Sequence, residues 1–225
     1  RTTSLSAYQY RFWLEWQLNP HSSAYTTALV YRLSGPLDRD ALRRALDAFV
    51  HEHDEGCRST FRMDGTRVVR DVHDRVAVAL DYRDARAAPS LDAAGADAWI
   101  AARAAHVFAL DDAPLFRFAL LREDADAHRL VLSFPHIISD AFSAVYINQR
   151  LTALYNHALG AGPAPACTLR DLGEQLAFEA AYRASSRYDE DLAYWLGALA
   201  QAPPGVGSDT CASAGAPRRR LPPTR

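Results

Sequence analysis

The chain has 225 residues, of which 49% are hydrophobic and 10% aromatic, and its formal net charge is −2. This is enough apolar material for a buried core, which excludes a wholly disordered or fibrous chain, and the near-neutral charge gives no reason to expect nucleic acid or an anionic membrane as partner. All 25 basic residues are arginine, which excludes a Schiff-base lysine and a Walker-type phosphate loop.

The first third of the chain alternates between helical and strand patterns. Residues 5–17 carry aromatic and apolar side chains at helical spacing, and residues 28–33 alternate as in a half-buried strand. Asp38 can cap a following helix. The inward stripe of that helix is predicted to be Leu42, Leu46, Phe49 and Val50.

The remainder mixes short strands with longer helices. Asp64-Gly65 is typical of a hairpin turn between the first two strands. Strands are predicted at 58–63, 67–72, 76–81, 115–122 and 129–134. Helices are predicted at 91–106, at about 140–158 with an end at Gly160, at about 169–184 and at 187–200. Helices and strands intermixed in this way predict an α+β fold, a layered sandwich.

The composition changes after residue 200. Alanine, proline, glycine and serine dominate the last part of the chain, with a short arginine cluster at 218–220. We therefore expect residues 1–200 to form one folded unit and residues 201–225 to be a linker or the start of a further lobe.

The most specific local feature is the segment Ser133–Asp140. A buried strand runs directly into a short turn that bears His136, and Asp140 then opens a helix. A histidine at a strand end can meet a substrate while its backbone stays rigid, and histidine is well suited to take a proton near neutral pH. The alternative is a structural histidine, because a single HxxxD pattern arises easily by chance. Asp140 either caps the helix or orients the imidazole.

A metal site is not predicted. His51 and His53 lie two residues apart at the end of a helix, so their side chains point to nearly opposite sides. Cys57 has no thiolate-stabilising motif and is predicted to be an inert small residue. Arg58 follows Gly56 into a strand, where its guanidinium either braces a carboxylate or is one exposed arginine among many.

The cysteine pattern and the first residues indicate the cellular compartment of the protein. Cys57, Cys167 and Cys211 are far apart and form no CxxC pair, which argues against a disulfide framework and favours a reducing cytoplasm. No apolar run approaches the roughly 20 residues of a spanning helix. The first residues also lack the apolar region of a signal peptide. A membrane partner is not expected.

Several segments, in order, resemble the condensation domains of nonribosomal peptide synthetases, within the chloramphenicol-acetyltransferase-like superfamily. Residues 5–13 resemble the first family motif, S-x-A-Q-x-R-L-W, with Tyr8 and Gln9 slightly altered in register. Residues 51–61 resemble R-H-E-x-L-R-T-x-F, which aligns Arg58 with the motif's last arginine. Residues 135–143 resemble H-H-x-x-x-D-G-x-S. Weaker matches are residues 33–38, 114–117 and 194–196.

The resemblance covers nearly all of residues 5–200 and implies a fold and a function. The family's whole domain has two similar lobes in a V, with the active site between them, so this chain would be the N-terminal lobe and would need the second. The family joins a donor acyl or peptidyl group, carried as a phosphopantetheine thioester, to the amine of an acceptor on a second carrier protein. No cofactor bound by the domain itself is implied.

The resemblance also implies residue roles. His136 would position or deprotonate the attacking amine, and Asp140 would pair with Arg58 as structural support. Two residues depart from the motif: Pro135 replaces its first histidine and Ala141 its glycine. Proline can stiffen the turn and leave His136 in place, whereas alanine adds a methyl group and disfavours positive φ.

Two functions follow from these observations. The first is an amide-forming acyltransferase that acts on carrier-bound thioesters, favoured because His136, Asp140 and Arg58 are all present. The second is a catalytically silent, condensation-like interface domain that recruits a tailoring enzyme, a neighbouring module or a carrier protein. In the first case the present chain alone is expected to be inactive, because half the walls of the active site would be missing.

Overall fold

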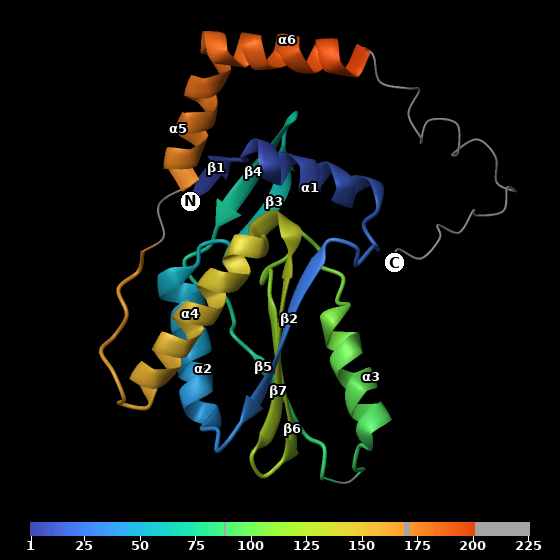
Figure 1. Ribbon diagram of the computed structural model, residues 1–225, viewed down its shortest axis with the longest axis vertical. Coiled ribbons are helices and arrows are strands. Elements are labelled where there is room, and N and C mark those ends of the chain that lie inside the picture. Colours follow the sequence, from blue (N-terminus) through green and yellow to red (C-terminus); the bar gives the residue numbers. More distant parts are fainter. Residues whose placement is uncertain (88, 169–171, 201–225) are drawn as a thin grey trace, which may run out of the picture. The chain divides into compact units, whose positions relative to one another are not determined.

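The computed structural model describes residues 1–87, 89–168 and 172–200 (Figure 1). The chain divides into two compact units, Arg1–Ala177 and Phe178–Arg225. The strands of the described ranges all lie in the first unit. The predicted linker at 201–225 and the first three residues of the helix predicted at 169–184 lie outside the described residues.

The first unit mixes helices and strands throughout its length. Its elements are β1 (Thr2–Ser4), α1 (Ala7–Leu18), β2 (Thr26–Ser34), α2 (Arg39–Ala48), a π-helical turn (Phe49–His53), β3 (Ser59–Asp64), β4 (Arg67–Val72), β5 (Leu80–Asp84), α3 (Ala93–Ala104), β6 (Arg117–Asp124), β7 (Ala127–Pro135), a 3₁₀ turn (His136–Ile138) and α4 (Ala141–Ala158). Helix α5 (Leu172–Arg183) crosses the boundary between the units, and α6 (Ser186–Ala200) belongs to the second.

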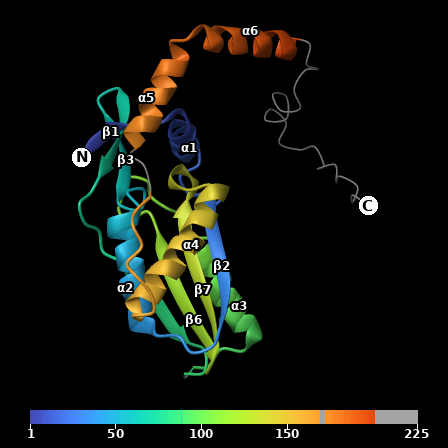
Figure 2. The same cartoon turned by 60° about the vertical axis from the view of Figure 1, so that its left-hand side comes forward.

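The strands form two sheets. The larger has the order β2-β7-β6-β5, with β5 parallel to β6 and the other pairs antiparallel. The smaller is the antiparallel sheet β1-β4-β3. Helices α2 and α4 lie side by side on one face of the larger sheet, and α3 covers the other face (Figures 1 and 2). The first unit is therefore a layered α+β sandwich, as the sequence predicts.

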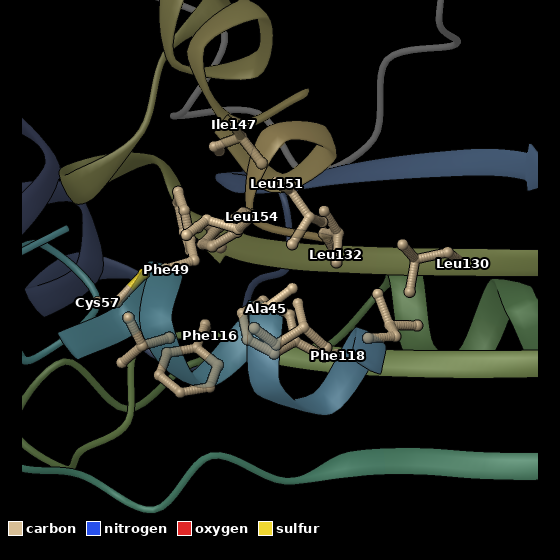
Figure 3. Close-up of a cluster of buried hydrophobic side chains, with 14 of the residues drawn as sticks. Ala45, Phe49, Cys57, Phe116, Phe118, Leu130, Leu132, Ile147, Leu151 and Leu154 are labelled. Atoms are coloured by element: carbon tan, nitrogen blue, oxygen red, sulfur yellow. The ribbon is translucent and has the colours of Figure 1, made fainter. Parts of the chain in front are cut away.

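The main core lies between the larger sheet and the pair α2 and α4 (Figure 3). The predicted stripe of α2 is buried there and meets side chains from β6, β7 and α4: Phe116, Phe118, Leu130, Leu132, Ile147, Leu151 and Leu154. Each fully buried side chain of this size contributes about 1.5–3 kcal/mol to folding. The core therefore fixes the strand β7 that leads to His136.

A second cluster of buried side chains holds the turn that follows β7. Ile137 packs with Trp13 of α1, Phe61 of β3 and Leu115, and all four are almost completely buried. Because Ile137 is the residue next to His136, this cluster anchors the turn to α1 and to the smaller sheet.

Several local predictions are confirmed. The Asp38 side chain caps α2 by accepting a hydrogen bond from the Ala41 N–H at 2.8 Å. Gly65 in the β3–β4 hairpin and Gly160 after α4 have φ of 61° and 75°, which glycine adopts without a steric penalty. Strand β4 has the predicted bounds, and the other predicted elements, apart from the strand at 76–81, agree to within about three residues at each end.

Two strand predictions are wrong. The strand predicted at 76–81 begins only at Leu80 and runs to Asp84. Val76 and Val78 pack against the main core without ladder pairing, so their alternation reflects burial and not a strand. Strand β1 is not predicted, because its three polar residues show no alternation of apolar and polar side chains. The strand forms through its pairing with β4. No helix within the described ranges is long and apolar enough to cross a membrane.

Candidate active site

His136 lies at the end of the central strand β7. Its backbone N–H donates a hydrogen bond to the Tyr25 carbonyl at 2.7 Å, which continues the pairing of β7 with β2 by one residue. Ile137 beside it is buried in the second core cluster, whereas the His136 side chain is only half-buried. The backbone is thus fixed and the imidazole remains accessible, as predicted for a histidine at a strand end.

Two aromatic residues of α1 hold the imidazole. The Tyr8 hydroxyl lies 2.8 Å from Nδ1 of His136. The Phe12 ring stacks on the imidazole with centroids 4.7 Å apart and planes 6° apart, and Tyr25 meets Phe12 edge-on. Neither Tyr8 nor Phe12 is predicted as a site residue, because their helical spacing indicates only an apolar stripe.

Asp140 caps helix α4. Its Oδ1 accepts hydrogen bonds from the Ser143 N–H and hydroxyl, both at 2.8 Å, and Ser143 Oγ accepts from the Asp140 N–H at 3.0 Å. Burial alone would raise the pKa of this carboxyl, but the hydrogen bonds from Ser143 and Phe142 and the charge of His136 outweigh burial and hold the pKa below its usual value. The sequence left two roles open, and the hydrogen bonds are those of a cap.

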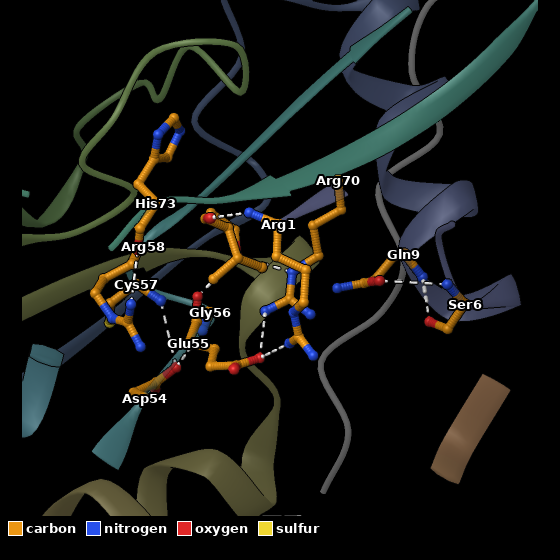
Figure 4. Close-up of polar contacts among 12 residues, drawn as sticks. Arg1, Ser6, Gln9, Asp54, Glu55, Gly56, Cys57, Arg58, Arg70 and His73 are labelled. Atoms are coloured by element: carbon orange, nitrogen blue, oxygen red, sulfur yellow. Dashed lines mark hydrogen bonds and ion pairs between the residues drawn. The ribbon is translucent and has the colours of Figure 1, made fainter. Parts of the chain in front are cut away.

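The predicted pair of Arg58 with Asp140 is absent. The Arg58 guanidinium donates instead to main-chain carbonyls: Nε to Val50 at 3.0 Å, and one terminal nitrogen to Asp74 at 3.3 Å and to His73 at 2.6 Å. Arg58 and His73 are shown in Figure 4. Arg58 is half-buried and joins the π-helical turn to the end of β4. Since these carbonyls lie within its reach and Oδ1 of Asp140 is engaged by Ser143, the guanidinium braces backbone and not a carboxylate.

The turn before Arg58 packs against the turn that bears His136. Asp54 Oδ1 accepts from the Gly56 N–H at 2.6 Å and the Cys57 N–H at 3.3 Å (Figure 4). Burial raises the pKa of Asp54, and it also raises the pKa of the fully buried Cys57 well above its usual value, with the Asp54 charge as the next cause. Cys57 is thus an inert core residue, as predicted. A Cβ placed on Gly56 would lie 3.2 Å from Cβ of Ile138.

A cavity of about 480 Å³ lies beside these two turns. Tyr8 lines it from α1, Arg58 from the position before β3, and the buried Arg70 from β4. Ser139 and Asp140, the two residues before α4, line it as well. His136 itself lines a separate, much smaller hollow together with Phe12 and Tyr25. Tyr8 therefore touches the larger cavity and bonds to the histidine as well.

The two departures from the motif are accommodated. Pro135 is the last residue of β7, where its carbonyl accepts a hydrogen bond from the Ser139 hydroxyl at 3.2 Å. Ala141 is exposed and is the first residue of α4; no non-glycine residue in the described part of the chain has positive φ, so glycine is not required here. His136 directly follows Pro135 and keeps its main-chain hydrogen bond to Tyr25. The His, Cys, Asp and Glu side chains of the described residues form no group of three suited to a metal ion.

Comparison with known proteins defines the class of this fold and site. The family model described as "Condensation domain" matches residues 1–207. The chain belongs to this family, and its fold is one lobe of the chloramphenicol-acetyltransferase-like architecture found in nonribosomal peptide synthetases.

Particular relatives bear this out. The chain is 36% identical over 165 residues to chondramide synthase cmdD of Chondromyces crocatus, which covers 72% of this chain and 4% of that protein. It is 31% identical over 196 residues to tyrocidine synthase 2 of Brevibacillus parabrevis, covering 87% of this chain and 5% of the relative. The chain therefore spans only a small part of these relatives.

Solved structures are similar as well. The first condensation domain of the calcium-dependent antibiotic synthetase, in complex with a substrate analogue, superposes with a TM-score of 0.81 at 30% identity, over 91% of this chain and 49% of that one. The starter condensation domain of rhizomide synthetase RzmA gives a TM-score of 0.76 at 28% identity, over 90% and 49%. This chain spans about half the length of these solved domains.

Proposed function

We propose that the protein joins a carrier-bound acyl or peptidyl thioester to the amine of a carrier-bound acceptor, with His136 as the residue that receives the proton of the attacking amine. The observation that carries the proposal is the half-buried His136 on the fixed end of β7, between Tyr8 and Phe12. Membership of the condensation-domain family supports the reaction class. Arg58 and Asp140 support the site from the two adjoining turns.

The proposed step balances as follows. The acceptor nitrogen attacks the thioester carbonyl carbon, a C–N bond forms, and the C–S bond to the donor's phosphopantetheine breaks. His136 takes the proton that the nitrogen loses and returns it, directly or through water, to the departing sulfur, which leaves as the thiol. Histidine suits this role because its ordinary pKa lies close to neutral pH. Both substrates arrive on phosphopantetheine arms, so the step requires no cofactor held by this chain.

The partners of the proposed reaction are a donor and an acceptor carrier protein, together with a second lobe that completes the domain. We expect the 225-residue chain alone to be inactive. It spans about half of the solved domain structures, and correct orientation of two substrates is worth roughly 7–11 kcal/mol of the barrier.

The test is a condensation assay on the protein that carries this chain. It is mixed with loaded donor and acceptor carriers, and the acceptor is analysed by mass spectrometry for the joined product. We expect product with the wild type and a loss of about 10²-fold or more in rate with His136→Ala, the range for removal of a general base. His21→Ala, which changes an exposed histidine in the loop after α1, is the matched control and should retain full activity.

Two results would contradict the proposal. One is full activity of His136→Ala. The other is a wild type that leaves every loaded pair unjoined, even after Pro135→His and Ala141→Gly restore the motif. A tightly bound tailoring enzyme in that second case would indicate the interface function.

A further inference from the structure

The capping box at the start of α1 fixes the backbone position of Tyr8. Ser6 and Gln9 form a capping box there: the Gln9 N–H donates to Ser6 Oγ at 3.2 Å, and the Ser6 N–H donates to Gln9 Oε1 at 3.3 Å (Figure 4). Both residues are buried. Tyr8 lies between them, so its backbone is fixed on the side of the helix that faces the turn after β7.

The motif quoted for residues 5–13 has no residue that can do what Tyr8 does. With Ser6 and Trp13 aligned to the first and last letters of S-x-A-Q-x-R-L-W, Gln9 matches its glutamine. This corrects the altered register expected above: the segment fits the motif without a shift. Tyr8 then stands at the alanine and Phe12 at the leucine. An alanine methyl group cannot form a hydrogen bond, whereas the Tyr8 hydroxyl lies 2.8 Å from Nδ1 of His136.

We propose that Tyr8 is a positioning residue that holds His136 in one tautomer: Nδ1–H donates to the Tyr8 oxygen, the Tyr8 hydroxyl donates to the Ser139 carbonyl, and Nε2 is left free to accept a proton. The proposal rests on the proposed function of His136. It assigns the tautomer that the reaction needs, because only an unprotonated ring nitrogen can act as a base.

Geometry supplies both hydrogen bonds of this relay. The Tyr8 oxygen lies 2.8 Å from Nδ1 and 3.4 Å from the Ser139 carbonyl oxygen, to which it is a donor. A hydroxyl has one proton to donate and can accept at the same time, so donation to Ser139 leaves the oxygen to accept from Nδ1–H.

The surroundings of Tyr8 keep its phenol protonated. Burial, and next the negative charge of Asp140, raise the pKa of the phenol, against a lowering by Arg11. A phenol that retains its proton near neutral pH has one to give to Ser139. Phe12 adds the second constraint, because its ring stacks flat on the imidazole and restricts rotation about the last side-chain bond. Together the two residues fix the plane of the imidazole and the ring nitrogen that carries its proton.

The first test reads the tautomer without any catalysis. Nitrogen NMR of the full chain labelled at histidine, at a pH where His136 is neutral, should show a protonated Nδ1 and an unprotonated Nε2; His136→Gln assigns the signals. In Tyr8→Phe, which keeps the ring and loses the hydroxyl, the preference should shift towards protonated Nε2. Tyr10→Phe, on the same helix with its ring stacked on Trp13, is the control and should leave the signals unchanged.

The second test measures catalysis by the protein that carries this chain. Tyr8→Phe should lower kcat by about 10- to 100-fold, the loss seen when the partner that orients a ligating histidine is removed, with KM for the loaded carriers nearly unchanged. Tyr8→Ala should behave in the same way, and circular dichroism shows whether each variant is folded. The acidic limb of the pH–rate profile should move in both variants, which a purely structural contact would not cause.

The outcomes separate the two proposals. A wild type with protonated Nε2, or a tautomer unaffected by Tyr8→Phe, overturns the role of Tyr8 whatever the activity. A wild type that shows the expected tautomer and forms no product supports the role of Tyr8 and contradicts the proposed function. A folded Tyr8→Phe with wild-type kcat and an unchanged pH profile also overturns the role of Tyr8.

Discussion

The end of β7 and the beginning of β3 each carry a predicted site residue, and they hold it by different means. His136 is held by side chains: a hydroxyl on Nδ1 and an aromatic ring on its face. Arg58 is held by main chain, through carbonyls that belong to the π-helical turn and to the residues after β4. The first residue keeps an accessible ring, whereas the second has Nε and one terminal nitrogen bound to main-chain carbonyls.

This difference assigns the two residues different kinds of task. A side chain whose polar atoms are bound to backbone serves the fold, because its loss leaves carbonyls without partners. A side chain held in place by neighbours, with one nitrogen free, can meet a substrate. Mutations on the Arg58 side should therefore lower stability first, and mutations on the His136 side should lower activity first.

The largest stability effect is expected at Arg58. Arg58→Ala removes three hydrogen bonds from a charged group and should lower the free energy of unfolding by about 3 kcal/mol, measured by urea denaturation. Arg58→Lys, which keeps the charge and loses the planar fork, should recover part of this. In a double-mutant cycle with Asp140→Ala, the two losses should add within about 0.5 kcal/mol. A larger coupling would mean that the two residues form a pair in solution.

A smaller effect is expected where the two regions touch, at Gly56. A Cβ at this position would lie 2.8 Å from Oδ1 of Asp54 and 3.2 Å from Cβ of Ile138. Asp54 is half-buried and accepts hydrogen bonds from the Gly56 and Cys57 N–H groups, so it has little room to move. Gly56→Ala should cost about 2 kcal/mol, within the range for overpacking. It should also lower condensation activity, because the turn of His136 is displaced.

The control for this prediction is Gly162→Ala. No atom lies within 4 Å of the added methyl group, so unfolding and activity should be nearly unchanged. If Gly56→Ala instead left both properties intact, the two turns would be mechanically independent.

The smallest effect is expected at Asp140. Asp140→Ala removes the N-cap and should lower the free energy of unfolding by about 1 kcal/mol. Asp140→Asn keeps a capping side chain and should lower it by only about 0.3 kcal/mol. The pKa of Asp140 is lowered from 3.8 in the folded state, so its charge stabilises the fold above that pH, and this contribution is lost as the pH falls through the folded pKa.

Urea titrations measure this dependence directly. The stability of the wild type relative to Asp140→Asn should shrink between about pH 6 and about pH 3. A difference that stays constant over this range would show that the carboxylate charge contributes nothing to folding.

Much of the fold and part of the site follow from local sequence. The stripe of α2, the Asp38 and Asp140 caps and the hairpin glycine each express a short-range rule, and all are observed. His136 at a strand end is also predicted, because the apolar run of β7 and the cap at Asp140 fix both sides of the turn.

Only the tertiary structure decided the partners of these residues. Arg58 could bind a carboxylate or a carbonyl, since a guanidinium can donate hydrogen bonds to either group. Its partner depends on which oxygens the π-helical turn and the end of β4 bring within reach. Tyr8 is 128 residues from His136 in the chain. Its role depends on the packing of α1 against the turn after β7. The buried cluster of Ile137, Trp13 and Phe61 holds these two elements together. Helical periodicity shows which face of α1 is apolar, but the atom that a hydroxyl on that face will meet depends on how the layers pack.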